Sequence, residues 1–337
     1  MNATFTFEKS NVFDTLLSKD ILDVSDMFGF REKELFHEAD KVRKKYCGRS
    51  IYIRGLIEFS NHCRRSCLYC GLRKENRNIR RYRMKPEEII KTAREVGAAG
   101  IKTVVLQSGD DYWYTAEMIA GIIAEIKKTR HMAVTLSLGE RPLKDYALWK
   151  KAGADRYLLR HETANPELYK KLHPGQDFNN RAAILRELNK LGYQTGAGCI
   201  VGLPGQTLRD LLKDILFLKE LDVYMAGIGP FIPHPDTPLG NCQPGSLKNV
   251  LKMVAAVRIV NKNIYLPATT AVGVIDEFGE KQALGAGANV IMIIFTPSEY
   301  RQLYEIYPGR VYSVKKPEDY IADYSREWDL DIIEEIH

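Results

Sequence analysis

Apolar residues in the first part of the chain, from residue 8 to residue 47, recur at intervals of three and four positions. This spacing places side chains on one face of a helix. The residues that follow it are Leu16, Leu17, Ile21, Leu22, Leu35, Phe36 and Val42. We therefore expect an N-terminal helical cap over residues 1–50.

Beyond residue 50 the pattern changes to short apolar stretches that alternate with amphipathic ones. Short apolar runs bounded by turn residues are typical of buried strands, and longer stretches with helical periodicity are typical of helices. The predicted strands are 51–59, 103–107, 133–138, 156–160, 195–201, 225–231, 264–268 and 289–294. The predicted helices are about 86–99, 115–130, 142–152, 179–191, 207–220, 246–262 and 277–285.

Local signals support several of these helix ends. Pro86, which is followed by two glutamates, and Thr207, which is followed by Asp210, are typical of helix starts. Glycines where helices should stop are Gly153, Gly192 and Gly287.

The alternation predicts the fold class. Eight strand–helix units in succession indicate an α/β fold, namely a closed (βα)8 barrel of the TIM type over residues 51–312. A doubly wound open sheet is the alternative. Residues 313–337 are acidic and weakly patterned. We interpret them as a C-terminal extension that lies over the barrel or is partly disordered.

Composition narrows the class of protein. The 337 residues, with 45% hydrophobic and 27% charged residues, suit one large domain or two ordinary ones. No stretch reaches the roughly 20 apolar residues of a membrane span, and residues 1–19 lack the layout of a signal peptide. Six cysteines, three of them clustered, indicate a metal site in a reducing compartment rather than a disulfide scaffold. We expect a cytoplasmic protein.

The net charge of +6 is spread along the chain, and the densest basic run covers residues 77–83. Two interpretations stay open for this run. It is either a solvated loop or a docking surface for an acidic electron donor. No basic and aromatic platform or nucleic-acid motif occurs, so we expect no nucleic-acid partner.

Three cysteines, Cys63, Cys67 and Cys70, stand at Cx₃Cx₂C spacing with no fourth cysteine nearby. Three thiolates can hold three corners of a [4Fe–4S] cluster and leave one iron open to a small molecule, whereas electron-transfer clusters usually take four cysteines. This spacing, with Tyr69 before the last cysteine, resembles the signature of radical S-adenosylmethionine (SAM) enzymes. A zinc site completed by His62, or three reduced thiols in a loop, are the alternatives. The scattered Cys47, Cys199 and Cys242 are expected to be buried or semi-buried small apolar residues.

Polar or glycine-rich segments follow every predicted strand, where a (βα)8 barrel collects its chemistry. They are 63–70, 108–110, 137–139, 160–163, 202–206, 230–235, 269–270 and 296–298. Arg160 and Glu162 lie two residues apart at a strand end, so they point the same way. Together they match the carboxylate and amine of an amino acid. The alternative is a structural pair with Arg181 at the barrel rim.

The glycine-rich segment 196–205 does not fit a dinucleotide or phosphate-loop fingerprint, because Val201 occupies the position of the final glycine. A backbone edge against a flat base explains these glycines better, although such glycines often only make a tight turn. His161, His173 and His234 lie nearest the predicted mouth, and we expect each to be packed or hydrogen-bonded rather than a ligand.

Longer motifs then become specific. Residues 63–70, 106–110, 158–165, 229–238 and 300–309 resemble the HydE-type [FeFe]-hydrogenase maturases. The likeness runs from about residue 30 to 310, and all but the first motif separate the chain from biotin synthase and methylornithine synthase. The resemblance implies a closed barrel, a SAM-bound [4Fe–4S] cluster and a role in building the hydrogenase active-site cluster.

The resemblance also implies residue roles. Cys63, Cys67 and Cys70 would hold the cluster. The SAM site would comprise Tyr69, Ser108, Gly109, Thr135, Ser137, Arg160, Glu162, Arg181, Ile200, Gly202 and Gly205, of which Arg160 and Glu162 would also be catalytic. The substrate cavity would be formed by Arg54, Gln107, Met225, Thr269, Thr270, Met292, Tyr304 and Tyr307. Some relatives carry a second cluster on cysteines near the C-terminus. No cysteine follows Cys242 here, so we expect one cluster only.

The expected activity is reductive cleavage of SAM, followed by attack of the 5′-deoxyadenosyl radical on a cysteine-bound iron carbonyl–cyanide precursor. The expected partners are that small substrate, a one-electron donor of the flavodoxin or ferredoxin type, and other hydrogenase maturation proteins. The alternative enzyme is a radical SAM mutase or biotin-synthase-like enzyme on an amino-acid-derived substrate. A non-catalytic iron–sulfur or zinc module is the third possibility.

Overall fold

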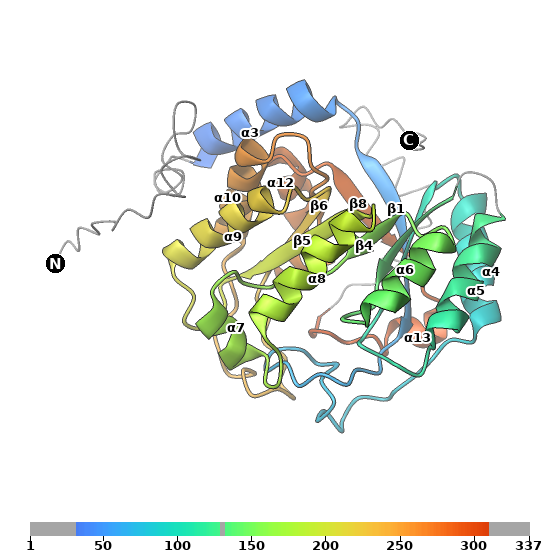
Figure 1. Ribbon diagram of the computed structural model, residues 1–337. Helices are drawn as coiled ribbons and strands as arrows, with labels where there is room; N and C mark the ends of the chain where they lie inside the picture. The colour runs from blue at the N-terminus through green and yellow to red at the C-terminus, as the bar shows by residue number, and fades with distance from the viewer. Residues whose placement is uncertain (1–31, 129–131, 310–337) are drawn as a thin grey trace.

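A computed structural model describes residues 32–128 and 132–309. Eight parallel strands form one sheet in the order β6-β5-β4-β3-β2-β1-β8-β7, with helices outside it (Figure 1). The strands are β1 Tyr52–Ser60, β2 Thr103–Ser108, β3 Ala133–Ser137, β4 Arg156–Leu158, β5 Gln194–Val201, β6 Met225–Pro230, β7 Pro267–Ala268 and β8 Val290–Ile294. All eight lie within or beside a predicted strand.

The sheet closes between β6 and β7, at a point where the ladder is short. Tyr265 donates its NH to the carbonyl of Tyr224, and Ala226 donates to the carbonyl of Tyr265, both at 2.9 Å. Met225 and Tyr265 thereby form a parallel bridge. The (βα)8 barrel is confirmed, and the open-sheet alternative is wrong.

The predicted helices are also found, within a few residues of their predicted bounds. They are α4 Pro86–Ala98, α5 Ala116–Lys127, α6 Leu143–Lys151, α8 Phe178–Lys190, α9 Leu208–Glu220, α10 Leu247–Val260 and α12 Gly279–Gly285. Thr207 accepts from the NH of Asp210 and gives its own NH to that carboxylate, so the predicted start of α9 is a capping box. The predicted helix stops have φ of +108°, +78° and +103° at Gly153, Gly192 and Gly287.

Three short helices were missed: α7 Pro166–Leu172, α11 Thr270–Ile275 and α13 Ser298–Arg301. Each is too short for a periodic pattern to register. Only α7 carries a local signal, because Asn165 caps it and Pro166 opens it. Strand β4 is shorter than predicted and ends at Leu158, since the chain turns into the site beyond that residue.

Helix α3, Glu32–Cys47, begins the described chain and packs against α10 and α12 (Figure 1). Figure 1 shows it at the end of the barrel opposite α7 and α13, away from the carboxyl ends of the strands. The rest of the predicted cap, residues 1–31, and the predicted extension 313–337 lie outside the described residues. The division into cap, barrel and extension stays a prediction.

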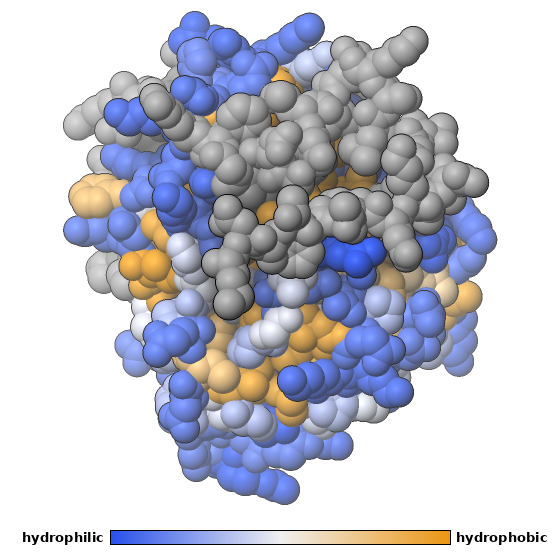
Figure 2. All heavy atoms as spheres, turned by 90° about the vertical axis from the view of Figure 1, so that its left-hand side faces the viewer, coloured by the Kyte–Doolittle hydropathy of each residue, from blue (hydrophilic) through white to orange (hydrophobic). Residues whose placement is uncertain are grey.

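Figure 2 shows the side that carries α9 and α10, where hydrophilic side chains surround a strip of hydrophobic ones. In the two described ranges, no helix combines the length and the apolar character that crossing a membrane requires.

Candidate active site

The cysteine loop leaves the carboxyl end of β1 and is held from behind by Arg81. The guanidinium donates to the carbonyls of Asn61 (2.5 Å), Leu72 (2.9 Å), Arg73 (2.7 Å) and Asn76 (3.2 Å). Four carbonyls from both flanks of the loop therefore converge on one cation. Part of the basic run 77–83 thus has a structural role that neither interpretation from sequence included.

Two of the three cysteine sulfurs accept hydrogen bonds, and all three thiols are shielded from water. Cys63 Sγ accepts from the NH groups of Arg65 (3.5 Å) and Asp110 (3.4 Å), and Cys67 Sγ accepts from the Gln176 amide (3.6 Å). Burial raises the pKa of Cys67 to about 12 and also raises the pKa values of Cys63 and Cys70. The loop therefore favours neutral thiols unless a metal binds, because a coordinating thiol is deprotonated by the metal.

The loop does not gather its ligands for one small ion. In the described part of the chain, one group of three ligand atoms lies within 4.8 Å, and it is His161, Cys199 and Asp214. The predicted alternative of a zinc site on the loop cysteines with His62 has no such arrangement here.

Charged side chains connect the cysteine loop to the ends of the next strands. Arg65 pairs with Asp110 after β2 and, at 3.0 Å, with Glu140 after β3. Glu140 also lies 2.6 Å from Nε of Arg181, whose Nη1 donates to the carbonyl of Arg160. Sequence reasoning missed Arg65 and Glu140, since nothing in their spacing shows that two separate loops meet.

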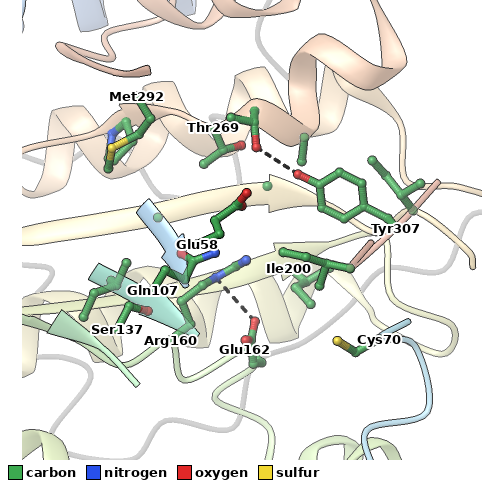
Figure 3. A pocket seen from close by; sticks show the side chains of 18 of the residues that line it. Glu58, Cys70, Gln107, Ser137, Arg160, Glu162, Ile200, Thr269, Met292 and Tyr307 are labelled. Atoms are coloured by element: carbon green, nitrogen blue, oxygen red, sulfur yellow. Dashed lines mark hydrogen bonds and ion pairs between the residues drawn. The ribbon is translucent and has the colours of Figure 1, made fainter. Parts of the chain in front are cut away.

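Arg160 and Glu162 face the same cavity, with Arg160 Nε 3.4 Å from Glu162 Oε2 (Figure 3). The carboxylate that pairs with Arg181 is Glu140, not Glu162. The alternative, in which Arg181 completes a structural ion pair, is therefore not what the structure has. Arg160 is further fixed by a hydrogen bond from Nη2 to the Cys199 carbonyl (2.6 Å). Glu162 has φ of +66°, a left-handed conformation that costs a side-chain-bearing residue on the order of 1–3 kcal/mol.

A cavity of about 330 Å³ opens at the carboxyl ends of the strands and extends into the barrel. The predicted residues that line it are Cys67, Tyr69, Cys70, Gln107, Ser108, Ser137, Arg160, Glu162, Arg181, Ile200, Thr269, Thr270, Met292, Tyr304 and Tyr307. Figure 3 shows the Arg160–Glu162 pair across the space from Thr269 and Tyr307. One wall thus carries charges near the cysteines, and the other carries hydroxyl groups.

The hydroxyl wall is held together by its own hydrogen bonds. Thr270 Oγ1 and the Tyr307 hydroxyl lie 2.9 Å apart, and Gln107 donates to the Tyr304 hydroxyl at 3.3 Å. Glu58 also points into the cavity and was missed, although a glutamate inside an apolar strand is a visible signal (Figure 3).

Three predicted residues, Arg54, Thr135 and Met225, are buried but do not line the cavity. On its strand, each of the three lies two positions before a residue that lines the cavity. Side chains two positions apart point to the same face of a strand. They therefore fill the barrel one layer deeper, where Arg54 donates to Met225 Sδ at 3.2 Å.

Gly202 and Gly205 are exposed outside the cavity, in the turn after β5. Both have positive φ, and a Cβ on Gly202 would lie 2.4 Å from Gly245 Cα. The turn therefore requires these glycines for its own geometry. Gly109 packs against the cysteine loop, since a Cβ there would lie 2.2 Å from the His62 carbonyl.

The histidines near the mouth are hydrogen-bonded, as predicted. His173 lies 2.8 Å from both the Tyr69 hydroxyl and the Tyr169 carbonyl. Burial lowers its pKa to about 4, so the ring is neutral, donates from Nδ1 and accepts from Tyr69. His173 thereby orients the tyrosine of the cysteine motif.

Comparison with known proteins agrees with this arrangement. Residues 57–218 match the radical SAM superfamily. The chain is 57% identical over 293 residues to the [FeFe] hydrogenase maturase subunit HydE of Thermotoga maritima, covering 87% of this chain and 83% of that protein. It is 29% identical to 3-methylornithine synthase of Methanosarcina acetivorans, over 79% of this chain and 75% of that one.

Solved structures share the fold. The crystal structure of methylornithine synthase (PylB) superimposes with a TM-score of 0.77 at 24% identity, covering 92% of this chain and 98% of that one. The X-ray structure of the FeFe-hydrogenase maturase HydG from Carboxydothermus hydrogenoformans superimposes with a TM-score of 0.77 at 21% identity, covering 94% of this chain and 77% of that one.

Proposed function

Because the chain belongs to the HydE-type [FeFe]-hydrogenase maturases of the radical SAM superfamily, we propose that it cleaves SAM to modify an organometallic precursor of the hydrogenase active site. One observation carries the proposal. The cysteine loop, the Arg160–Glu162 pair and the hydroxyl wall share one cavity, so a radical made at one end would meet a substrate at the other.

Cys63, Cys67 and Cys70 would hold the one [4Fe–4S] cluster that we propose. The hydrogen-bond donors to Cys63 and Cys67 support this assignment. When bound, the cluster would supply the one electron needed for reductive cleavage of SAM, and the three cysteines would hold it at the end of the cavity where SAM binds.

Arg160 would bind the SAM carboxylate, and Glu162 would bind its amine. Charge-assisted hydrogen bonds of this kind contribute about 1.5–3 kcal/mol each. Ser108, Ser137 and Arg181 complete the polar side of the same cavity. Tyr69 and Ile200 would contact adenine, since they bring an aromatic ring and an apolar side chain to the same cavity and pack in one apolar cluster. Gly109, Thr135, Gly202 and Gly205 would support this wall from behind.

The substrate would be a cysteine-bound iron carbonyl–cyanide complex. Its anionic ligands would accept hydrogen bonds from Thr269, Thr270 and Tyr307, which face the cavity. Gln107, Met292 and Tyr304 would enclose the rest, with Arg54 and Met225 in the layer below. Enclosure within the barrel would keep water from the radical.

The electron would come from an acidic one-electron donor of the flavodoxin or ferredoxin type. Arg64, Arg77 and Arg80 are exposed near the cysteine loop, and Tyr112 and Trp113 are 41% and 50% exposed beside it. The Arg64 guanidinium lies 4.4 Å from the ring of Tyr112. Arginine and aromatic side chains are the residues that dominate protein interfaces, and the positive charge suits an acidic partner. Other hydrogenase maturation proteins would receive the product.

The test measures 5′-deoxyadenosine released by the anaerobically reconstituted protein with SAM and a strong reductant. We expect release to rise at least tenfold on addition of the iron carbonyl–cyanide complex, with consumption of that complex. Slow release that the complex does not change would contradict this substrate. It would favour a mutase or biotin-synthase-like reaction on an amino-acid-derived substrate.

A further inference from the structure

Glu162 adopts a backbone conformation that residues with a side chain rarely take. It is one of two non-glycine residues with positive φ in the described ranges 32–128 and 132–309. Its NH donates to the Gly198 carbonyl and its carbonyl accepts from the NH of Ile200, both at 2.9 Å. These bonds attach the Glu162 peptide to β5. The conformation itself is set by the residues on either side.

His161, the residue before Glu162, points the opposite way, toward α9. Its ring is fully buried and meets the ring of Phe217 edge to face, with centroids 5.0 Å apart. Nδ1 lies 3.3 Å from the backbone nitrogen of Gly198, and Nε2 lies 3.2 Å from Oδ1 of Asp214. A backbone NH can only donate, so Nδ1 accepts and Nε2 carries the hydrogen that Asp214 receives.

Asp214 of α9 binds the same turn a second time. Its Oδ1 also accepts from the NH of Ala164 at 2.5 Å. One buried carboxylate thus holds the residue before Glu162 and the residue two positions after it. Away from water, a lost partner is not replaced, so both bonds resist rearrangement of the turn.

A metal ion is the competing explanation for this cluster, because the ligand atoms of His161, Cys199 and Asp214 lie within 4.8 Å of one another. A histidine binds a metal through a ring nitrogen that carries no hydrogen and makes no other bond. Nδ1 accepts from Gly198, and Nε2 with its hydrogen faces Asp214. The hydrogen bonds therefore favour a His–Asp pair over a metal site.

We propose that His161 and Asp214 are positioning residues that hold Glu162 in its left-handed conformation and so aim its carboxylate at the amine of SAM. This inference rests on the proposed function, in which Glu162 contacts SAM. Neither His161 nor Asp214 lines the cavity, so both would act only through Glu162.

The test compares two ligands on the reconstituted holoenzyme by equilibrium dialysis. Asp214→Leu removes both hydrogen bonds at similar size. We expect its Kd for SAM to rise about tenfold, and its Kd for 5′-methylthioadenosine, which lacks the amino-acid end, to change less than twofold. Equal weakening of both ligands, or of neither, would overturn the inference.

The matched control is Asp210→Ala, one turn earlier on α9. Asp210 accepts from the NH of Thr207 and from the Asn165 side chain, both at 2.8 Å, whereas the hydrogen bonds to His161 and Ala164 come from Asp214. We expect a lower melting temperature with both Kd values within twofold of the parent. If Asp214→Leu does not fold, Asp214→Asn keeps the Oδ1 acceptor without the charge. We then expect about threefold weaker SAM binding and unchanged 5′-methylthioadenosine binding.

A double-mutant cycle with Glu162→Gln separates the inference from the proposed function. If Glu162→Gln alone leaves the SAM Kd unchanged, the proposed contact with SAM is wrong. The positioning role is wrong if Glu162→Gln raises the Kd for SAM and if Asp214→Leu raises it further, by the same factor in the Glu162→Gln background as in the parent. We expect little further loss in the double variant. A metal ion beyond the cluster iron, lost in Asp214→Leu, would also overturn the inference.

Discussion

Arg81 offers the sharpest test of how the fold builds the cysteine loop. Replacing it by methionine removes four hydrogen bonds, to the carbonyls of Asn61, Leu72, Arg73 and Asn76. At about 0.5–1.5 kcal/mol net for each bond, the loss is roughly 2–6 kcal/mol. Arg81 is only half buried, so water replaces part of the lost hydrogen bonding and the loss lies near the lower end of this range. About 2 kcal/mol corresponds to roughly a 30-fold increase in loop opening.

Hydrogen exchange of the loop amides measures this opening directly. We expect protection at residues 61–83 to fall about 30-fold in Arg81→Met, with protection of the barrel strands unchanged. The iron retained after reconstitution and gel filtration should fall with it. Arg80→Met is the matched control, because Arg80 is exposed and only its backbone carbonyl is used, by Asn61. Equal protection and equal iron content in the two variants would refute the reasoning.

Three further predictions concern packing, pH and electron supply. A Cβ on Gly71 would lie 2.2 Å from the Glu305 carbonyl and 2.5 Å from the His234 ring, so Gly71→Ala should lower the free energy of unfolding by about 2 kcal/mol or more. Gly121 in α5 has open space around its Cβ position, so Gly121→Ala should not lower it. Equal free energies of unfolding for the two variants in denaturant would contradict this packing. The folded pKa of His173, about 4, lies below its ordinary 6.5, so its contribution of about 3 kcal/mol is full above pH 6.5 and is lost as pH falls toward 4. His173→Gln should therefore flatten the dependence of melting temperature on pH between 7.5 and 5, and an unchanged slope would count against a neutral buried His173. Arg77→Glu with Arg80→Glu should raise the KM for an acidic protein donor about tenfold while leaving SAM cleavage by a chemical reductant unchanged, and a KM that stays constant would exclude this surface.

The barrel could be predicted from sequence because its signals are local. Apolar strands, helix starts such as Thr207 and stops such as Gly192 are set within a few residues. The cysteine spacing and the two-residue offset of Arg160 and Glu162 are local as well. Both survive in the structure as one cavity lined by Cys67, Cys70 and the charged pair.

What sequence could not provide were contacts between distant loops. Arg81 reaches back across the cysteine loop, and Glu140 joins Arg65 to Arg181 over many residues of chain. The left-handed Glu162 was equally hidden, because its conformation depends on Asp214 of a later helix. These residues position the site through contacts between segments far apart in the sequence, so no local motif indicates them.

The proposed activity depends on a cluster that Cys63, Cys67 and Cys70 would hold and on which SAM would be cleaved. The most direct measurement is iron, sulfide and 5′-deoxyadenosine per chain in the anaerobically reconstituted parent and in Cys67→Ala. We expect about four irons and four sulfides with SAM cleavage in the parent, and loss of cleavage in Cys67→Ala. One zinc per chain in the parent, or SAM cleavage retained in Cys67→Ala, would contradict it.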